Sequence, residues 1–309
     1  MGGAGTDARE ARAVRRLGRP RLLLLGCGDV GLRIVARLHA RFRIVALTST
    51  PQRVPALRAA GVVPLLGDLD RRDSLDRLAP FARRTVHLVP PPGEGEKDRR
   101  TRHLRAALGA RPRRFVYVST TGVYGDAGGA WLDETSPAAA RTPRARRRVD
   151  GERVVRAAPW RGTVLRVPGI YAHDRLPLDR LQRGLPALAA EDDVYTNHIH
   201  AEDLARAVIA ALFRGRAGRV YNVVDDSAMR MGEYLDLVAA HAGLPPPPRL
   251  PRAAIRTAVS PAMYSFMEES RRLRNHRLRR ELRLRLLWPS VHAALAEPQA
   301  ALANPAQIG

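Results

Sequence analysis

Short apolar runs alternate along this chain with segments whose apolar residues recur at helical spacing. The first run, residues 21–25, ends in Gly-x-Gly-x-x-Gly at residues 26–31, and Val30, Ile34 and Leu38 follow at helical intervals. A short continuous apolar run is typical of a buried parallel strand, and the spacing after it indicates an amphipathic helix. This part of the chain therefore predicts a strand, a tight turn and a helix in direct succession.

The same alternation continues through most of the chain. It predicts strands at 43–48, 62–66, 85–89, 115–119, 162–167 and 220–224, and helices at 53–60, 98–109, 144–157 and 233–242. Strands that alternate with helices form parallel sheets with right-handed crossovers. We therefore expect an α/β fold, a doubly wound parallel sheet, with a smaller C-terminal lobe.

The glycine pattern between the first strand and its helix predicts a dinucleotide site. Gly26 permits a tight turn, Gly28 lets a pyrophosphate approach the backbone, and Gly31 lets the helix pack closely on the strand. Asp29 and Val30 complete the loop, whose unpaired amides lie at the positive end of the helix and favour an anion. The expected domains are a tail at 1–19, a Rossmann core at 20–170 and a substrate lobe at 171–309, which is interleaved with the last strands.

The end of the second strand favours NADP over NAD. A NAD-selective site carries an acidic residue about 20 positions after the glycines, where it bonds the ribose 2′-hydroxyl. Here that place holds Thr48, Ser49 and Thr50, with Arg53 just beyond. Hydroxyls and a guanidinium suit a 2′-phosphate better than a carboxylate would. The alternative is that Arg53 merely begins a solvated helix.

Residues at the carboxyl ends of later strands are expected to border the same crevice, because ligands bind at this edge of doubly wound sheets. They are Asp68 and Leu69 after the third strand, and Val89 with the loop 90–93 after the fourth. His87 lies inside the fourth strand, where a histidine is more often packed than catalytic. We therefore expect His87 to be structural.

The composition excludes several classes of protein. Basic residues number 53 against 30 acidic ones, giving a net charge of +23, but the arginines are spread over the whole chain and Lys97 is the only lysine. This spread argues against a nucleic-acid-binding stripe, which would gather the charge on one face. Cys27 is the only cysteine, which excludes an intrachain disulfide and fits the cytoplasm. No apolar stretch approaches the ~18 residues of a membrane span, and residues 22–25 are too short for an export signal.

Several further motifs, in this order, give the chain a family resemblance. They are Ser119–Gly125, Leu165–Tyr171, Asn197–Ala205, Tyr221–Val223, Ser270–Asn275 and Trp288–Ser290. With the glycine loop, they resemble the extended short-chain dehydrogenases/reductases, the family of nucleotide-sugar epimerases and dehydratases, over residues 20 to about 295. The resemblance implies a small-molecule substrate that is nucleotide-linked in many relatives. It also admits a homodimer through the helices flanking the fourth and fifth strands.

The chain departs from this family at its catalytic pair. Family members carry Tyr-x-x-x-Lys on the helix after the fifth strand, one turn apart, so that both side chains face the crevice. Aligned through Glu152, this chain has Arg144 at the Tyr position and Arg148 at the Lys position. Because residue 93 is Gly, the sole lysine, Lys97, has no partner tyrosine either. Arginine stays protonated near neutral pH and cannot shuttle the proton, although Arg148 could still hold a ribose or phosphate. The departure matches the group called atypical short-chain dehydrogenases.

Three hydroxyl residues are candidates for the remaining chemistry. By the resemblance, Thr120 occupies the place of the family's active-site Ser/Thr and would hydrogen-bond a substrate oxygen; alternatively it satisfies loop amides at the strand end. Tyr124 and Tyr171 are the phenols that the resemblance places near the crevice, and either could replace the missing acid or simply pack a loop.

The second lobe supplies the candidate substrate contacts Asn197, His200 and Arg271. His198 and His200 alternate along an extended segment, so their spacing does not predict a metal pair, and we expect no metal. Residues 268–286 hold many arginines and an apolar set at Leu273, Leu278, Leu282 and Leu286. They predict a solvated amphipathic helix closing the lobe, with phosphate capture by Arg271 or Arg272 as the alternative.

Two functions from different classes remain open. The first is an NAD(P)-binding oxidoreductase or epimerase-like enzyme with an unassigned proton donor. The second is a non-catalytic NADP(H)-binding redox sensor that controls a protein partner. The lost Tyr/Lys pair favours the sensor, whereas the retained motifs of the second lobe favour the enzyme. A nucleic-acid scaffold would require the arginines to form one contiguous face.

Overall fold

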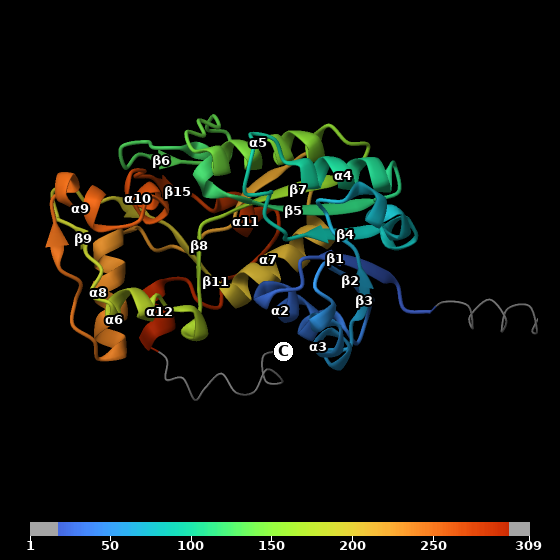
Figure 1. The fold of residues 1–309 in the computed structure, drawn as a ribbon, viewed down its shortest axis with the longest axis horizontal. Coiled ribbons are helices and arrows are strands. Elements are labelled where there is room, and N and C mark those ends of the chain that lie inside the picture. Colours follow the sequence, from blue (N-terminus) through green and yellow to red (C-terminus); the bar gives the residue numbers. More distant parts are fainter. Residues whose placement is uncertain (1–17, 297–309) are drawn as a thin grey trace, which may run out of the picture.

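The computed structural model describes residues 18–296, so most of the expected tail at 1–19 lies outside the described residues. In the described part of the chain, seven parallel strands form one sheet in the order β12-β7-β5-β4-β1-β2-β3 (Figure 1). The strands are β1 (Arg21–Leu25), β2 (Arg43–Thr48), β3 (Val63–Leu66), β4 (Arg84–His87), β5 (Arg114–Thr120), β7 (Gly162–Val167) and β12 (Val220–Asn222). The doubly wound α/β fold expected from the sequence is confirmed.

Helices cover both faces of this sheet. They are α2 (Asp29–Leu38), α3 (Val54–Ala59), α4 (Arg99–Leu108), α5 (Pro143–Arg156) and α7 (Ala201–Arg214). In Figure 1, α4 and α5 lie above the sheet, and α2 and α7 lie below it. A ten-residue 3-10 segment, Arg72–Phe81, takes the place of a helix between β3 and β4.

The apolar pattern of β1 explains why it lies inside the sheet, between β4 and β2. Leu22 and Leu24 belong to the hydrophobic core that β1 shares with α2 and α7, whereas Leu23 and Leu25 belong to the core on the opposite face. All four side chains are fully buried. Successive side chains of a strand point to opposite faces, so an unbroken apolar run is what a strand covered on both sides requires.

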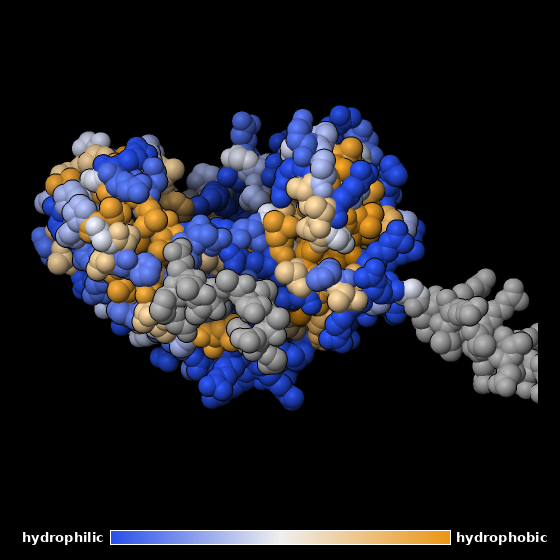
Figure 2. Space-filling view, turned by 90° about the horizontal axis from the view of Figure 1, so that it is seen from below, coloured by the Kyte–Doolittle hydropathy of each residue, from blue (hydrophilic) through white to orange (hydrophobic). Residues whose placement is uncertain are grey.

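The smaller lobe gathers elements from the C-terminal half of the chain. They are β8 (Gly169–Tyr171), α6 (Leu178–Gln182), β9 (Ala187–Leu188), β10 (Tyr195–Thr196), β11 (His198–His200), β13 (Met229–Arg230), α8 (Met231–Ala242), β14 (Arg249–Leu250), α9 (Arg252–Ala258), α10 (Pro261–Met267) and α12 (Val291–Ala296). Its own core includes Leu181, Leu235, Val238 and Trp288. In the space-filling view, a notch separates this lobe on the left from the sheet domain on the right, and hydrophilic residues line much of it (Figure 2).

The helix expected over residues 268–286 is wrong. The structure has β6 (Trp131–Leu132) paired in parallel with β15 (Arg272–Leu273), followed by the short α11 (His276–Arg280) and an irregular segment. The expected apolar set is nevertheless buried: Leu273, Leu278, Leu282 and Leu286. The backbone of this segment pairs with β6, which lies far away in the sequence. This pairing satisfies amides that a helix would have satisfied locally, so tertiary context overrides the helical spacing.

Among residues 18–296, no helix combines the length and the apolar character needed to cross a membrane.

Candidate active site

Two glycines of the loop after β1 are required by close packing. Gly26 has a φ of +90°, and a Cβ added there would lie 2.9 Å from the Val89 side chain and 3.1 Å from the Val89 backbone nitrogen. A Cβ on Gly31 would lie 2.8 Å from the Gly26 carbonyl oxygen. Larger residues at either position would push helix α2 away from β1 and from the loop after β4. Val89 therefore buttresses the glycine loop.

Gly28 differs from these two glycines because it faces open space. A Cβ added to it would meet no other atom within 4 Å, although its φ of −79° is accessible to any residue. It is the N-cap residue of α2, and no side chain of the described residues caps this helix. The first helical bond runs from Leu32 N to the Gly28 carbonyl, which leaves the amides of Asp29, Val30 and Gly31 without an intrahelical acceptor. Open space in front of free amides at a helix N-terminus fits a diphosphate.

The Asp29 side chain ties the glycine loop to the smaller lobe. Its carboxylate accepts hydrogen bonds from Arg33 (2.9 Å) and from Arg175 (2.9 Å). Arg33 also donates to Glu202 (3.0 Å) and to Asp174 (3.1 Å). The negative charge of Asp29 is thus paired with guanidinium groups at the mouth of the helix, where it would otherwise oppose an anion.

The end of β2 brings Arg53 against the glycine loop. Arg53 donates from Nη2 to the Cys27 carbonyl at 2.7 Å, although it also ends the 3-10 turn that precedes α3. Thr48 is buried and its hydroxyl bonds to the backbone of Thr50. A guanidinium therefore lies beside the loop at the place where the sequence predicted a contact to the 2′-phosphate. Burial raises the pKa of the neighbouring Cys27 thiol, so this thiol stays protonated.

The loops after β3 and β4 are held together by an ion pair. Asp68 accepts a hydrogen bond from the Asp70 amide, and Asp70 pairs with Arg100. Arg100 also donates to the Pro90 carbonyl at 3.0 Å. Leu69, which lies in the loop after β3, is buried. The pairing places both loops at the same edge of the sheet as the glycines.

His87 is structural, as expected. The ring is fully buried, and Nε2 lies 3.2 Å from the Thr101 hydroxyl. Burial lowers the pKa of His87 to about 4.

Two cavities meet beside the end of β5. The first, of about 310 Å³, is lined by Pro90, Pro91, Pro92, Gly93, Thr120, Arg144, Arg147 and Arg148. The second, of about 230 Å³, is lined by Thr120, Thr121, Gly122, Arg144, Pro168, Gly169, Tyr195, Thr196, Asn197, Met231, Phe266, Glu269 and Arg271. Thr120 and Arg144 line both. The pair of cavities thus joins the loop after β4 to segments of the smaller lobe.

The geometry of Thr120 leaves its hydroxyl proton available. Its oxygen accepts a hydrogen bond from the Gly122 amide at 3.2 Å, which is the strand-end role considered above. Within residues 18–296 the hydroxyl donates to no acceptor. The side chain can therefore donate a hydrogen bond into the cavities while its oxygen is held by the backbone.

The two arginines that the sequence analysis set at the family's Tyr and Lys positions lie on α5, which Thr142 caps through the Ala145 amide. Arg148 donates to the Val118 carbonyl at 2.7 Å and lines the cavity beside the loop 90–93. The Arg144 guanidinium lies over the Phe266 ring, 4.2 Å from its centroid.

The two phenols singled out from the sequence are both in the interior. The Tyr124 hydroxyl donates to Asn222 Oδ1 at 2.7 Å, and the Arg166 guanidinium covers its ring. Tyr171 is buried beside Asp225. Burial is the larger cause of its raised pKa, and the Asp225 carboxyl raises the pKa further. Neither tyrosine lines the two cavities.

The candidate substrate contacts separate into two groups. Asn197 and Arg271 line the second cavity, and the Asn197 amide also holds the 271–273 segment by hydrogen bonds of 3.0 Å to the Arg271 carbonyl and from the Leu273 amide. His200 does not line it: the ring stacks on Trp288 with centroids 3.9 Å apart. Among the described residues, no cluster of His, Cys, Asp or Glu is suited to a metal ion.

Sequence reasoning missed Tyr195, the phenol that does line the second cavity. Two guanidiniums lie near its ring, with the carbon of Arg272 at 4.5 Å and that of Arg230 at 5.6 Å from its centroid. Tyr195 stands two residues before Asn197, so the same motif could have indicated it. Phe266 and Glu269 had no such signal.

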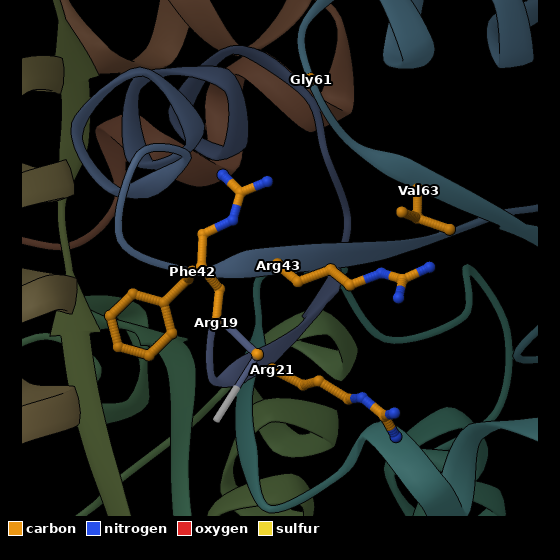
Figure 3. A pocket seen from close by; sticks show the side chains of 7 residues that line it. Arg19, Arg21, Phe42, Arg43, Gly61 and Val63 are labelled. Carbon is orange, nitrogen blue, oxygen red and sulfur yellow. The ribbon is translucent and has the colours of Figure 1, made fainter. Parts of the chain in front are cut away.

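A third cavity, of about 500 Å³, lies at the opposite edge of the sheet, beside the amino ends of β1 and β2 (Figure 3). Three of its lining residues are Arg19, Arg21 and Arg43, but their guanidinium groups point in different directions (Figure 3). They do not converge on a common point, and doubly wound sheets bind ligands at the carboxyl edge. The two cavities around Thr120 are therefore the better candidates.

Comparison with known proteins finds a family model, described as NAD(P)H-binding, that matches residues 26–214. YeeZ of Escherichia coli strain K12 is 27% identical over 241 residues, covering 74% of this chain and 85% of YeeZ. A solved structure of a conserved protein of unknown function from Silicibacter pomeroyi DSS has a TM-score of 0.76 and 31% identity, covering 91% of this chain and 98% of its own. A structure from Methylobacillus flagellatus, described as a candidate NAD-dependent epimerase/dehydratase, has a TM-score of 0.69 and 25% identity, covering 93% and 100%.

Proposed function

The chain belongs to the NAD(P)H-binding family, and on this premise we propose that it is an NADP(H)-dependent oxidoreductase acting on a small organic substrate. The family that the sequence motifs indicated, NAD(P)-binding and epimerase/dehydratase-like, is confirmed. The coenzyme preference, the substrate and the reaction are parts of the proposal.

One observation carries the proposal of catalysis. Thr120, at the end of strand β5, lines a cavity that is also lined by residues of the smaller lobe, among them Asn197 and Arg271. A protein that only sensed the coenzyme would need the glycine loop but no second cavity beside it. A cavity with convergent polar groups at the carboxyl edge of the sheet is the usual location of a substrate.

The coenzyme fits the residues around the glycine loop. The free amides at the start of α2 would hold the diphosphate, and Arg53 would hold the 2′-phosphate that distinguishes NADP from NAD. Arg148, beside the loop 90–93, would contact a ribose hydroxyl or phosphate. When bound, the nicotinamide would supply or accept a hydride.

The protein's own groups would orient the substrate and move the proton. Thr120 would donate a hydrogen bond to the reacting oxygen, since its hydroxyl proton is unused. Tyr195 is the phenol on the cavity wall, and we propose it as proton donor in place of Tyr124 and Tyr171. The guanidiniums of Arg230 and Arg272 lie near its ring.

The first experiment is a fluorescence titration with NADPH and with NADH, expected to show tighter binding of NADPH. Oxidation of NADPH is then followed with a panel of carbonyl compounds. We expect Thr120→Val and Tyr195→Phe to lower turnover at least about 100-fold, the lower range for general acid–base catalysis, while leaving the Kd of NADPH within about twofold. Tyr264→Phe, in a tyrosine of α10 that does not line the cavity, is the matched control. Unchanged turnover in Tyr195→Phe would remove this residue from the mechanism.

A non-catalytic NADP(H)-binding regulator remains the second candidate. It is favoured by Arg144 and Arg148 standing where the family carries its catalytic pair. This alternative predicts tight NADPH binding without turnover, together with different hydrogen-exchange patterns of the NADPH and NADP⁺ complexes around the loop 90–93. If the protein turns over any carbonyl substrate and Thr120→Val abolishes this turnover, the non-catalytic regulator is excluded.

The expected assembly and location remain part of the proposal. A homodimer would use α4 and α5, the helices that flank β4 and β5, and the protein would work in the cytoplasm. Light scattering on the full chain tests the dimer, because a monomeric mass at micromolar concentration would contradict it.

A further inference from the structure

Arg144 is a guanidinium that lines a cavity without a partner. Within residues 18–296 it forms no hydrogen bond and no ion pair, in contrast to its neighbour Arg146, which pairs with Glu96 at 3.2 Å. The Arg144 guanidinium carbon lies 4.2 Å from the centroid of the Phe266 ring, and its N–H groups form no hydrogen bond with the described residues. Because Arg144 lines both cavities, it stands where they join.

The other charged groups around the two cavities leave the positive charge in excess. The described lining residues include four guanidiniums, those of Arg144, Arg147, Arg148 and Arg271, and a single carboxylate, that of Glu269. Glu269 is paired with Arg271 at 2.7 Å through Oε2, and its Oε1 is buried without a partner among the described residues. Partial burial lowers the pKa of Arg144, the nearby Glu269 carboxylate raises it, and the three other arginines lower it further.

Two of these arginines also hold donors that have no acceptor among residues 18–296. Arg147 is 7% exposed and spends one N–H on the Gly95 carbonyl, while its Nε is buried without a partner. Arg271 bonds the Gly125 carbonyl, and its Nε is likewise buried and unpartnered. Buried donors without an acceptor are costly and are rare in folded proteins. Around the two cavities, the described residues therefore leave more guanidinium donors than carboxylate acceptors unpaired.

We propose that Arg144 binds an oxyanion of the substrate, a carboxylate or a phosphate, at the junction of the two cavities beside Thr120. The inference rests on the proposed function, because it takes the bound anion to be the substrate. A planar guanidinium held on an aromatic ring offers two parallel N–H donors, which match the two oxygens of such a group. The replacement that removed the family's phenol thus converts this position from proton transfer to anion recognition.

The test measures binding of three probes by calorimetry at constant ionic strength: malonate, inorganic phosphate and the neutral malonamide. The full chain is titrated with and without saturating NADPH. We expect malonate or phosphate to bind at least about tenfold more tightly than malonamide, since a hydrogen bond to a charged group strengthens binding by more than about tenfold. The stronger of the two anions identifies the carboxylate or the phosphate as the recognised group.

The variants separate this site from general attraction by a basic protein. Arg144→Gln is expected to weaken anion binding at least about tenfold, and Arg144→Lys, which keeps the charge but loses the fork, by less. Arg146→Gln removes the same charge two residues away and is expected to stay within about twofold of the unmodified protein. Circular dichroism checks that each variant is folded. If Arg144→Gln does not fold, the anion affinity of Arg144→Lys tests the proposal in its place.

Two results would overturn the proposal: equal affinity for malonamide and both anions, or equal weakening in Arg144→Gln and Arg146→Gln. If NADPH binds and the anions do not, the oxidoreductase proposal stands and this inference fails. If the anions bind through Arg144 and NADPH does not, the oxidoreductase proposal fails and the anion site remains.

Discussion

Gly28→Ala separates coenzyme binding from folding in a way that the other loop glycines do not allow. At this position the backbone has a φ of −79°, and an added Cβ meets no protein atom within 4 Å. The same methyl group would stand in front of the free amides of the first turn of α2. The added methyl group therefore occupies space in which the diphosphate would lie, and it displaces no protein atoms.

The structure sets the magnitude of both effects. Alanine is a poorer N-cap residue than glycine, but it restricts the unfolded chain, so the free energy of unfolding should change by less than about 1 kcal/mol. A hydrogen bond to a charged group contributes about 1.5–3 kcal/mol, so loss of one amide–phosphate bond should weaken NADPH binding about 10- to 150-fold.

The assay combines NADPH fluorescence titration with urea denaturation of the same samples. Gly31→Ala is the contrasting variant, because its Cβ would lie 2.8 Å from the Gly26 carbonyl oxygen and must displace backbone. We expect it to lose about 1–3 kcal/mol of stability in addition to affinity. If Gly28→Ala bound NADPH as tightly as the unmodified protein, the diphosphate would not lie on these amides, and the assignment of the coenzyme site would be refuted.

Three other perturbations test the coenzyme contact and the buried charges. Arg53→Gln removes the guanidinium beside the glycine loop and should weaken NADPH binding about tenfold while NADH binding stays within about twofold; equal losses for both coenzymes would place the 2′-phosphate elsewhere. Glu152→Gln leaves Arg166 buried without its carboxylate partner and should lower the free energy of unfolding in urea by about 3–5 kcal/mol; a loss below about 1 kcal/mol would contradict the buried pair. Burial raises the pKa of Asp225 to about 8, so from its ordinary value of about 4 up to pH 8 the folded state binds more protons than the unfolded state, and stability falls as the pH rises. Asp225→Asn should therefore gain stability relative to the unmodified protein steadily from pH 4 to pH 8 in thermal unfolding, with a constant difference below pH 4; a difference independent of pH throughout would show that Asp225 titrates normally. Buried His198, whose pKa burial lowers to about 3, gives the opposite slope in both proteins and cancels in this comparison.

Much of the fold could be predicted from the sequence because its signals are local. The helix expected at 98–109 is observed as α4 (Arg99–Leu108), and the strand expected at 162–167 is β7. Each of these elements is defined by apolar spacing within about ten consecutive residues, which the chain carries wherever it folds. The helix expected over the arginine-rich segment 268–286 was wrong for the same reason. Amides of this segment pair with β6, and no local pattern in the sequence indicates a partner so far away.

The sequence by itself determined the glycine loop, the strands that carry it and the loss of the Tyr/Lys pair, because these depend on residue identity and short spacings. Only the tertiary structure decided which side chains face the cavities: it buried Tyr124 and Tyr171 and placed Tyr195 and Phe266 beside α5. The physical reason is that a side chain's surroundings are set by contacts between segments far apart in the chain. The Phe266 ring beside the Arg144 guanidinium comes from a residue more than 100 positions away, and no spacing within α5 encodes this contact.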